Sequence, residues 1–189
     1  MFTNSPNNLV YLDIETTGFN PNGAKIVEIA MLKIKNGKSE SYETLVNPQC
    51  FIPLECSRVH GIYNDMVKDS PSFSEIAKSV AEFIADTIIV CHNAKFDLSF
   101  VSKELEESGI RGKSLQYIDT LELARKHFSF DSNALGAIAN AIGLEVETAH
   151  RAMADVLTMF SVSKYLFSNM YRKGIFEVEP KIYKLKSED

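Results

Sequence analysis

The sequence has few cysteines, no apolar run long enough to cross a membrane, and no basic-then-apolar segment near its start. Its cysteines, Cys50, Cys56 and Cys91, are odd in number and form no Cys-x-x-Cys pair. This argues against a disulfide framework or a zinc site and favours reduced thiols in the core. Residues 1–8 are polar and do not resemble a signal peptide, so a cytoplasmic location is expected.

The remaining composition is that of a single folded domain. Of the 189 residues, 45% are hydrophobic and 24% charged, enough to bury one sizeable core. Apolar patterns predict strands at residues 9–15, 26–34, 39–46, 87–91 and 115–118. Helices are predicted at residues 72–85, 96–108, 121–127, 133–142 and 152–171, with a long irregular segment at 47–71. The chain thus begins with consecutive strands and continues with strands that alternate with helices. This order indicates an α/β sheet with helices on both faces.

Two acidic residues interrupt the first predicted strand. Because alternate strand residues point to the same face, Asp13 and Glu15 should project side by side. Carboxylates in a buried strand are costly unless positive charge compensates them, and a divalent cation does so most effectively. Asp13 could instead cap a turn at the strand end, but Glu15 and the Thr-Thr-Gly sequence after it favour a metal site.

A histidine and an aspartate lie five positions apart near the last predicted helix. Five residues correspond to about 140° around a helix axis, so His150 and Asp155 cannot share a helix face. The periodicity places Asp155 in the early turns and His150 just before the helix. From there His150 can approach a metal without being its ligand, although alone it would more often be a surface or capping residue.

Five motifs follow one another between residues 9 and 167. They are Asp-x-Glu-Thr-Thr-Gly from Asp13, Val-His-Gly-Ile from Val59, His-Asn-Ala-x-Phe-Asp from His92, Asp-Thr-Leu-x-Leu-Ala-Arg from Asp119 and His-x-x-x-x-Asp from His150. Each alone is weak, but in this order they resemble the DEDDh 3′–5′ exonucleases. That family includes the proofreading epsilon subunit of bacterial DNA polymerase III, ribonuclease T and oligoribonuclease. The resemblance implies a ribonuclease H-like fold with a mixed five-stranded sheet, an exonuclease domain at residues 1–175 and a short C-terminal extension at 176–189.

The resemblance also implies a mechanism, phosphodiester hydrolysis with two divalent cations, Mg²⁺ or Mn²⁺, about 3.5–4 Å apart. Asp13 would bridge both ions. Glu15 and Asp155 would complete the site on the nucleophile side, and Asp97 would support the leaving-group side. His150 would act as general base, a role suited to a group whose unperturbed pKa is about 6.5. Taken alone, Asp97 would more often be an acid placed at a helix N-terminus.

Substrate contacts are expected from loop residues next to these acids: Thr16, Thr17, Gly18, Phe19, His60, His92 and Asn93. The two threonines would hold a terminal 3′-hydroxyl, so that the product is a nucleoside 5′-monophosphate. His60 and His92 could equally shape their loops. Phe19, in a turn, is a better candidate for base stacking than Phe96 and Phe100, whose helical i, i+4 spacing indicates core positions.

The net charge of −5 is unusual for a protein that contacts phosphates. Two divalent cations would bring it to −1, so we expect weak non-specific affinity that depends on the bound metal. Six basic residues could form a local patch, although a solvated helix end and tail explain them equally well. These residues are Lys164, Arg172, Lys173, Lys181, Lys184 and Lys186.

The expected partner is single-stranded nucleic acid with a free 3′ end. DNA is favoured because Asp-Ile-Glu-Thr-Thr-Gly together with Val-His-Gly-Ile resembles the epsilon-like branch, which also suggests a DNA polymerase subunit as partner. An RNA exonuclease of the ribonuclease T or oligoribonuclease kind would use the same acids and histidine. A catalytically silent docking subunit should have lost a metal ligand or the histidine, and none is missing here.

Overall fold

The computed structural model describes residues 8–111, 114–145 and 150–184. Its strands are β1 (Asn8–Thr16), β2 (Ile26–Lys35), β3 (Lys38–Leu45), β4 (Ile88–Cys91), β5 (Leu115–Asp119) and β6 (Lys181–Tyr183). Its helices are α1 (Leu54–His60), α2 (Asn64–Val67), α3 (Phe73–Ile84), α4 (Ala94–Glu107), α5 (Thr120–His127), α6 (Leu135–Ala141) and α7 (Ala152–Arg172).

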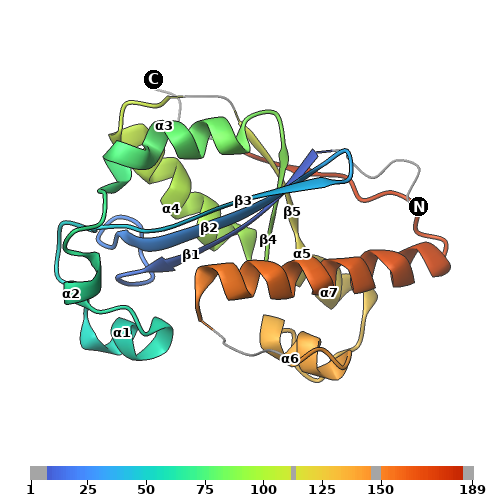
Figure 1. Cartoon of the computed structure of the whole chain (residues 1–189). Coiled ribbons are helices and arrows are strands. Elements are labelled where there is room, and N and C mark those ends of the chain that lie inside the picture. Colours follow the sequence, from blue (N-terminus) through green and yellow to red (C-terminus); the bar gives the residue numbers. More distant parts are fainter. Residues whose placement is uncertain (1–7, 112–113, 146–149, 185–189) are drawn as a thin grey trace.

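These strands form one mixed sheet in the order β3-β2-β1-β4-β5-β6. The first three strands pair antiparallel, as do β5 and β6, whereas β4 pairs parallel with both β1 and β5. Figure 1 shows α3 and α4 on one face of the sheet and α5, α6 and α7 on the other. The predicted α/β class with helices on both faces is therefore confirmed.

The sheet has six strands where five were expected. The additional strand, β6, has three residues and pairs antiparallel with β5. Its Lys-Ile-Tyr sequence is too short for a period of two to be recognised. The strand lies within residues 176–189, so part of the expected C-terminal extension joins the sheet.

The segment at residues 47–71, expected to be irregular, contains α1 and α2. These helices have seven and four residues, shorter than the 11-residue window in which helical periodicity can be read. Helix α1 ends at Gly61, whose φ of 73° is a left-handed conformation that glycine adopts without strain. Among the described residues, no helix is both long and apolar enough to span a membrane.

Strand β1 separates two hydrophobic cores and carries the polar site at its end. Val10 and Leu12 pack in the core beneath α3 and α4, whereas Leu9 and Tyr11 pack with α7. The Tyr11 hydroxyl lies 2.9 Å from Ser163 Oγ of α7. Because side chains alternate along a strand, the residues that continue the row of Leu9 and Tyr11 lie on the face that α7 covers.

Candidate metal and catalytic site

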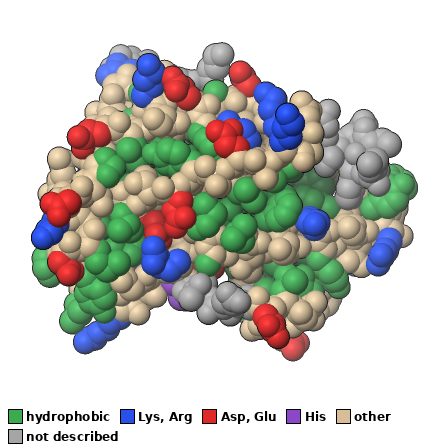
Figure 2. All heavy atoms as spheres, in the orientation of Figure 1, with side chains coloured by type: hydrophobic (Ala, Val, Ile, Leu, Met, Phe, Trp, Pro, Cys, Tyr) green, Lys and Arg blue, Asp and Glu red, His purple; other side chains and the backbone are tan. Residues whose placement is uncertain are grey.

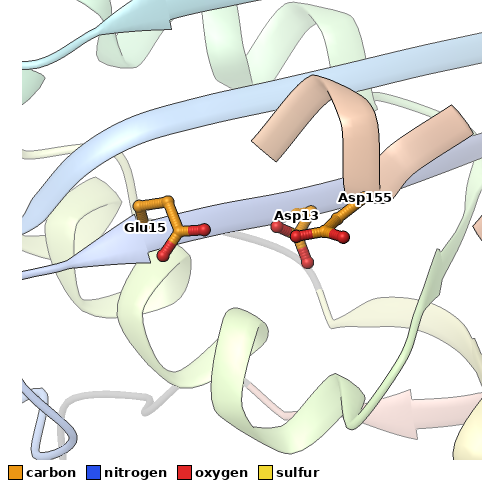
Figure 3. A group of neighbouring side chains, drawn as sticks. All are labelled: Asp13, Glu15 and Asp155. Atoms are coloured by element: carbon orange, nitrogen blue, oxygen red, sulfur yellow. The ribbon is translucent and has the colours of Figure 1, made fainter. Parts of the chain in front are cut away.

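Three carboxylates meet where the end of β1 passes the start of α7. Asp13 and Glu15 continue the α7-facing row of β1, and Asp155 lies in the first turn of α7. One oxygen from each of the three lies within 4.8 Å of the others (Figure 3). All three side chains are half-buried, so solvent ions can reach them. In the space-filling view, acidic, basic and histidine side chains gather between α1 and the start of α7 (Figure 2).

Burial and mutual repulsion make these carboxylates hard to ionise together. The pKa of Asp13 is raised well above its ordinary value, chiefly by burial and then by the charges of Asp97, Asp155 and Glu15. Burial and the charge of Asp155 raise the pKa of Glu15 to about 8. Without a cation, Glu15 therefore retains its proton at neutral pH. Several carboxylate oxygens close together are the ligands that Mg²⁺ and Mn²⁺ prefer, so the donor set fits a divalent cation.

Asp97 lies beside this cluster, in the first turn of α4. Its side chain is buried, and burial raises its pKa well above the ordinary value, whereas the N–H groups of Asp97 itself and of Ile14 lower it. The carboxyl group thus lies against β1 at Ile14 and repels the charge of Asp13. Asp97 is not part of the group whose ligand atoms lie within 4.8 Å of one another. The structure therefore brings it next to Asp13 but outside the closest three carboxylates.

His150 lies just before α7, as its spacing from Asp155 predicts. The residue is exposed and has a φ of 63°, in the left-handed region. Its backbone N–H donates a hydrogen bond to Asp155 Oδ2 at 3.0 Å. This bond, which the five-residue spacing does not predict, holds the backbone of His150 at the carboxylate cluster.

The turn between β1 and β2 brings four predicted substrate residues to the same place. Thr16 Oγ1 donates to the carbonyl of Gly18 at 2.7 Å, and Thr17 Oγ1 accepts the N–H of Lys25 at 2.9 Å. A Cβ atom at Gly18 would lie 3.3 Å from Ala24 Cβ, closer than most such contacts, so a larger residue there would require Ala24 to move by a few tenths of an ångström. Phe19 is 89% exposed and has no core role.

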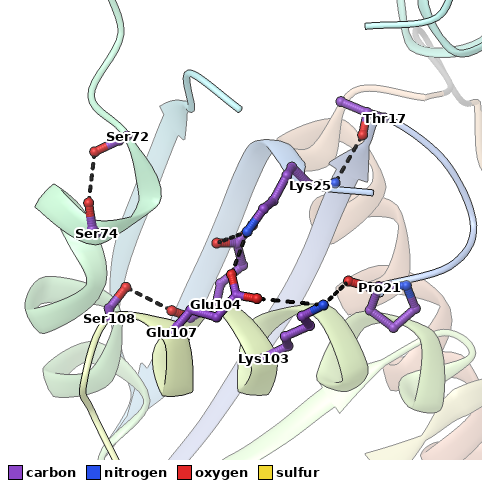
Figure 4. Close-up of polar contacts among 9 residues, drawn as sticks. All are labelled: Thr17, Pro21, Lys25, Ser72, Ser74, Lys103, Glu104, Glu107 and Ser108. Atoms are coloured by element: carbon purple, nitrogen blue, oxygen red, sulfur yellow. Dashed lines mark hydrogen bonds and ion pairs between the residues drawn. The ribbon is translucent and has the colours of Figure 1, made fainter. Parts of the chain in front are cut away.

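An ionic network attaches this turn to α4. Lys103 Nζ donates to the carbonyl of Pro21 at 2.8 Å and lies 3.5 Å from Glu107. Lys25 Nζ contacts Glu107 at 2.5 Å and Glu104 at 3.4 Å (Figure 4). Since α4 also carries Asp97, the network fixes the turn relative to the carboxylates.

The other three predicted substrate residues have clear structural contacts. His92 Nε2 donates to the Asn133 carbonyl and Nδ1 lies 2.9 Å from Thr120 Oγ1, so this ring shapes its loop. Asn93 has a φ of 79° and is the N-cap residue of α4. The buried His60 accepts the N–H of Ile62 through Nδ1, which leaves the proton on Nε2. Burial lowers the pKa of this ring, whereas its hydrogen bond to the Thr16 backbone raises it.

Sequence reasoning assigned no role to Asp119, which lies at the end of β5. Its carboxylate accepts the N–H groups of Asn93 (3.1 Å) and Ala94 (3.0 Å) at the start of α4, and that of Leu121 (2.9 Å) at the start of α5. It thereby fixes the start of the helix that carries Asp97. An aspartate just before a helical pattern is an N-cap signal, but a contact with a second helix leaves no trace in local sequence.

Glu28 also had no predicted role. It lies on β2 directly opposite Glu15 and is 1% exposed. Arg151 and the N–H of Ala152 bind its carboxylate. The sequence feature that could have pointed to Glu28 is its position as the one charged residue within the apolar run Ile-Val-Glu-Ile-Ala-Met-Leu.

A family model and several curated proteins match this chain. The exonuclease family model RNase_T matches residues 10–162. A PolC-type DNA polymerase III of Clostridium perfringens is 34% identical over 163 residues, which are 85% of this chain but 11% of the polymerase. The epsilon subunit of DNA polymerase III from Buchnera aphidicola (strain Bp) is 32% identical, with 89% of this chain and 74% of that subunit covered. The chain thus spans about a tenth of the PolC-type relatives and three quarters of this epsilon subunit.

Solved structures show the same fold. Exonuclease I of E. coli in complex with a dT13 oligonucleotide has a TM-score of 0.75 at 16% identity, covering 88% of this chain and 42% of that one. Exonuclease X in complex with 5′ overhanging duplex DNA has a TM-score of 0.66 at 25% identity, covering 88% and 93% of the two chains. The predicted ribonuclease H-like fold is confirmed.

Proposed function

The chain belongs to the exonuclease family, and we propose that it is a metal-dependent enzyme that removes nucleotides from the 3′ end of single-stranded DNA. The released products are nucleoside 5′-monophosphates. One observation carries the proposal: Asp13, Glu15 and Asp155 present oxygens within 4.8 Å of one another, with Asp97 and His150 beside them.

In this proposal the carboxylates hold two divalent cations, Mg²⁺ or Mn²⁺. Asp13, Glu15 and Asp155 are the ligands best placed for this, and Asp97 supports the site from α4. A bound divalent cation lowers the pKa of water and offsets the charge that develops on the phosphate. Because the carboxylates repel one another without a cation, these acids favour loading with metal.

His150 is the proposed general base. It is an exposed residue whose backbone is bonded at the carboxylate cluster, and an imidazole can accept a proton from an attacking water and release it to solvent. The turn of Thr16 and Thr17 binds the terminal nucleotide, with exposed Phe19 against its base. Proton transfer is thus assigned to His150, and binding of the nucleotide to the turn that carries Phe19.

The preference for DNA rests on the relatives. The epsilon subunit and PolC-type polymerase to which the chain is similar are named for DNA polymerase III, and exonucleases I and X were solved with DNA. The same relatives support a DNA polymerase subunit as partner. An RNA exonuclease would have the same carboxylates and histidine, so the two substrates must be separated by experiment.

A side-by-side digestion tests the proposal. Labelled single-stranded DNA, RNA and short oligoribonucleotides, each with a free or blocked 3′ end, are incubated with the protein, with Mg²⁺ or with a chelator. We expect stepwise shortening of DNA from free 3′ ends, abolished by the chelator and by Asp13→Asn. Asp65→Asn, on the exposed face of α2, is the matched control and should digest like the native protein. Faster loss of RNA than DNA would reassign the substrate, and activity that survives chelation would overturn the proposal.

A further inference from the structure

Glu28 is a buried carboxylate next to the proposed metal site. It lies on β2, directly opposite Glu15 in the antiparallel register, and is 1% exposed. A buried carboxylate without a partner is very costly, and a like charge directly across the strand pair adds repulsion. Its neighbours in space must therefore compensate it.

Within the part of the chain that the structure describes, the hydrogen bonds to this carboxylate come from the start of α7. Arg151 donates through Nε at 3.1 and 3.2 Å to the two oxygens and through Nη2 at 2.6 Å to Oε1. The N–H of Ala152 donates to Oε2 at 2.9 Å. Arg151 is the N-cap of α7 but makes no side-chain cap bond. Glu28, more than 120 residues away in sequence, supplies the capping carboxylate instead.

Asp155 and His150, the two proposed functional residues at this end of α7, depend to different degrees on the contact between Glu28 and the start of the helix. Asp155 is part of α7, which is anchored by the fully buried Val156 and Met159. His150 lies outside the helix and is exposed. It is bonded covalently to Arg151, and its N–H reaches Asp155. Fixing the Arg151 side chain on β2 therefore fixes the residue that joins His150 to the helix.

We propose that Glu28 and Arg151 are a pair of positioning residues that hold His150 at the carboxylate cluster, an inference that rests on the proposed function of His150 as general base. Neither residue needs to touch the substrate. The guanidinium also neutralises Glu28, so the negative charge that remains for cations belongs to Asp13, Glu15 and Asp155.

Two kinds of variant break the contact. Arg151→Lys keeps the positive charge but cannot reproduce the two-point contact of the guanidinium. The double variant Glu28→Met, Arg151→Met replaces the pair by apolar side chains of similar length, a change that often preserves folding. At saturating Mn²⁺ and DNA, we expect the single-turnover rate of both to fall about 10- to 100-fold, the scale of a misplaced catalytic group. Lys78→Met, Glu82→Met removes an exposed ion pair of α3 and should leave the rate unchanged.

The same substitutions in a His150→Ala background separate positioning from a merely structural role. If the pair acts through His150, Arg151→Lys should change the residual rate less than about twofold, because residues that act as a unit are not additive. An equal rate loss in both backgrounds would overturn the inference. So would a native rate in both the lysine variant and the double methionine variant.

A readout independent of activity distinguishes failure of this inference from failure of the proposed function. The amide of His150, bonded to Asp155, should exchange with solvent faster in Arg151→Lys by NMR. The amide of Val162, in the buried middle of α7, should not change. A native protein without metal-dependent nuclease activity would refute the proposed function, whereas unchanged His150 exchange would refute the positioning role.

Discussion

The backbone N–H of His150 donates to Asp155 Oδ2 at 3.0 Å, so the proposed base and a proposed metal ligand are joined by a hydrogen bond across the first turn of α7. A helix would separate residues five apart by about 140°. The left-handed φ of 63° at His150 turns its N–H back towards the helix instead. Two residues that no regular helix could bring together thus share one site.

The raised carboxyl pKa values predict how stability depends on pH and metal. In the folded protein the pKa of Glu15 is about 8 against an ordinary 4.5, so the folded state binds more protons than the unfolded state between these values. By linkage, the free energy of unfolding of the metal-free protein falls as pH rises through this window. The contribution of protonated Glu15 to that free energy is fully present only below about pH 4.5. Melting temperatures at pH 5 and 8, with chelator and with Mg²⁺, should show that metal stabilises more at pH 8.

Glu15→Gln is the control for this pH dependence. It removes one titrating group and should flatten the metal-free decline between pH 5 and 8 while weakening Mg²⁺ stabilisation. A variant with the native pH slope would show that Glu15 does not contribute to the pH dependence of stability in this range.

Asp119→Asn should destabilise the protein by about 1–3 kcal/mol, because an amide cannot accept all the bonds that the carboxylate accepts from backbone N–H groups of Asn93, Ala94 and Leu121. Urea unfolding measures the change, and Asp131→Asn, in an exposed loop, should stay within about 0.5 kcal/mol of the native protein. Equal stability of the two variants would mean that Asp119 does not hold the start of α4.

Phe19→Ala should weaken substrate binding without affecting the fold. The side chain is 89% exposed, and stacking of a base on an aromatic ring contributes about 1–3 kcal/mol. We expect KM for single-stranded DNA to rise by about 5-fold or more, with kcat less affected. Phe51→Ala, at 75% exposure, is the matched control. If both variants raise KM equally, the effect is not specific to the turn at Phe19.

The sequence predicted what local periodicity encodes. A period of two placed Asp13 and Glu15 on one face, and the helical period placed His150 outside α7. The bonds of Glu28 and Asp119 could not be read in this way, because they join residues that only the strand register and the packing of α7 bring together. The strand β6 and helices α1 and α2 were too short for any period to emerge.

A calorimetric Mn²⁺ titration of Asp13→Ala and His150→Ala, paired with their single-turnover rates on single-stranded DNA, tests the central claim most directly. Asp13 lies within the carboxylate cluster, and His150 reaches it through a backbone bond. The account predicts that Asp13→Ala loses both metal binding and turnover. His150→Ala should keep nearly native metal affinity while its rate falls about 10²- to 10⁴-fold, the usual cost of losing a general base. Metal loss in His150→Ala as severe as in Asp13→Ala would make His150 a ligand and contradict the account.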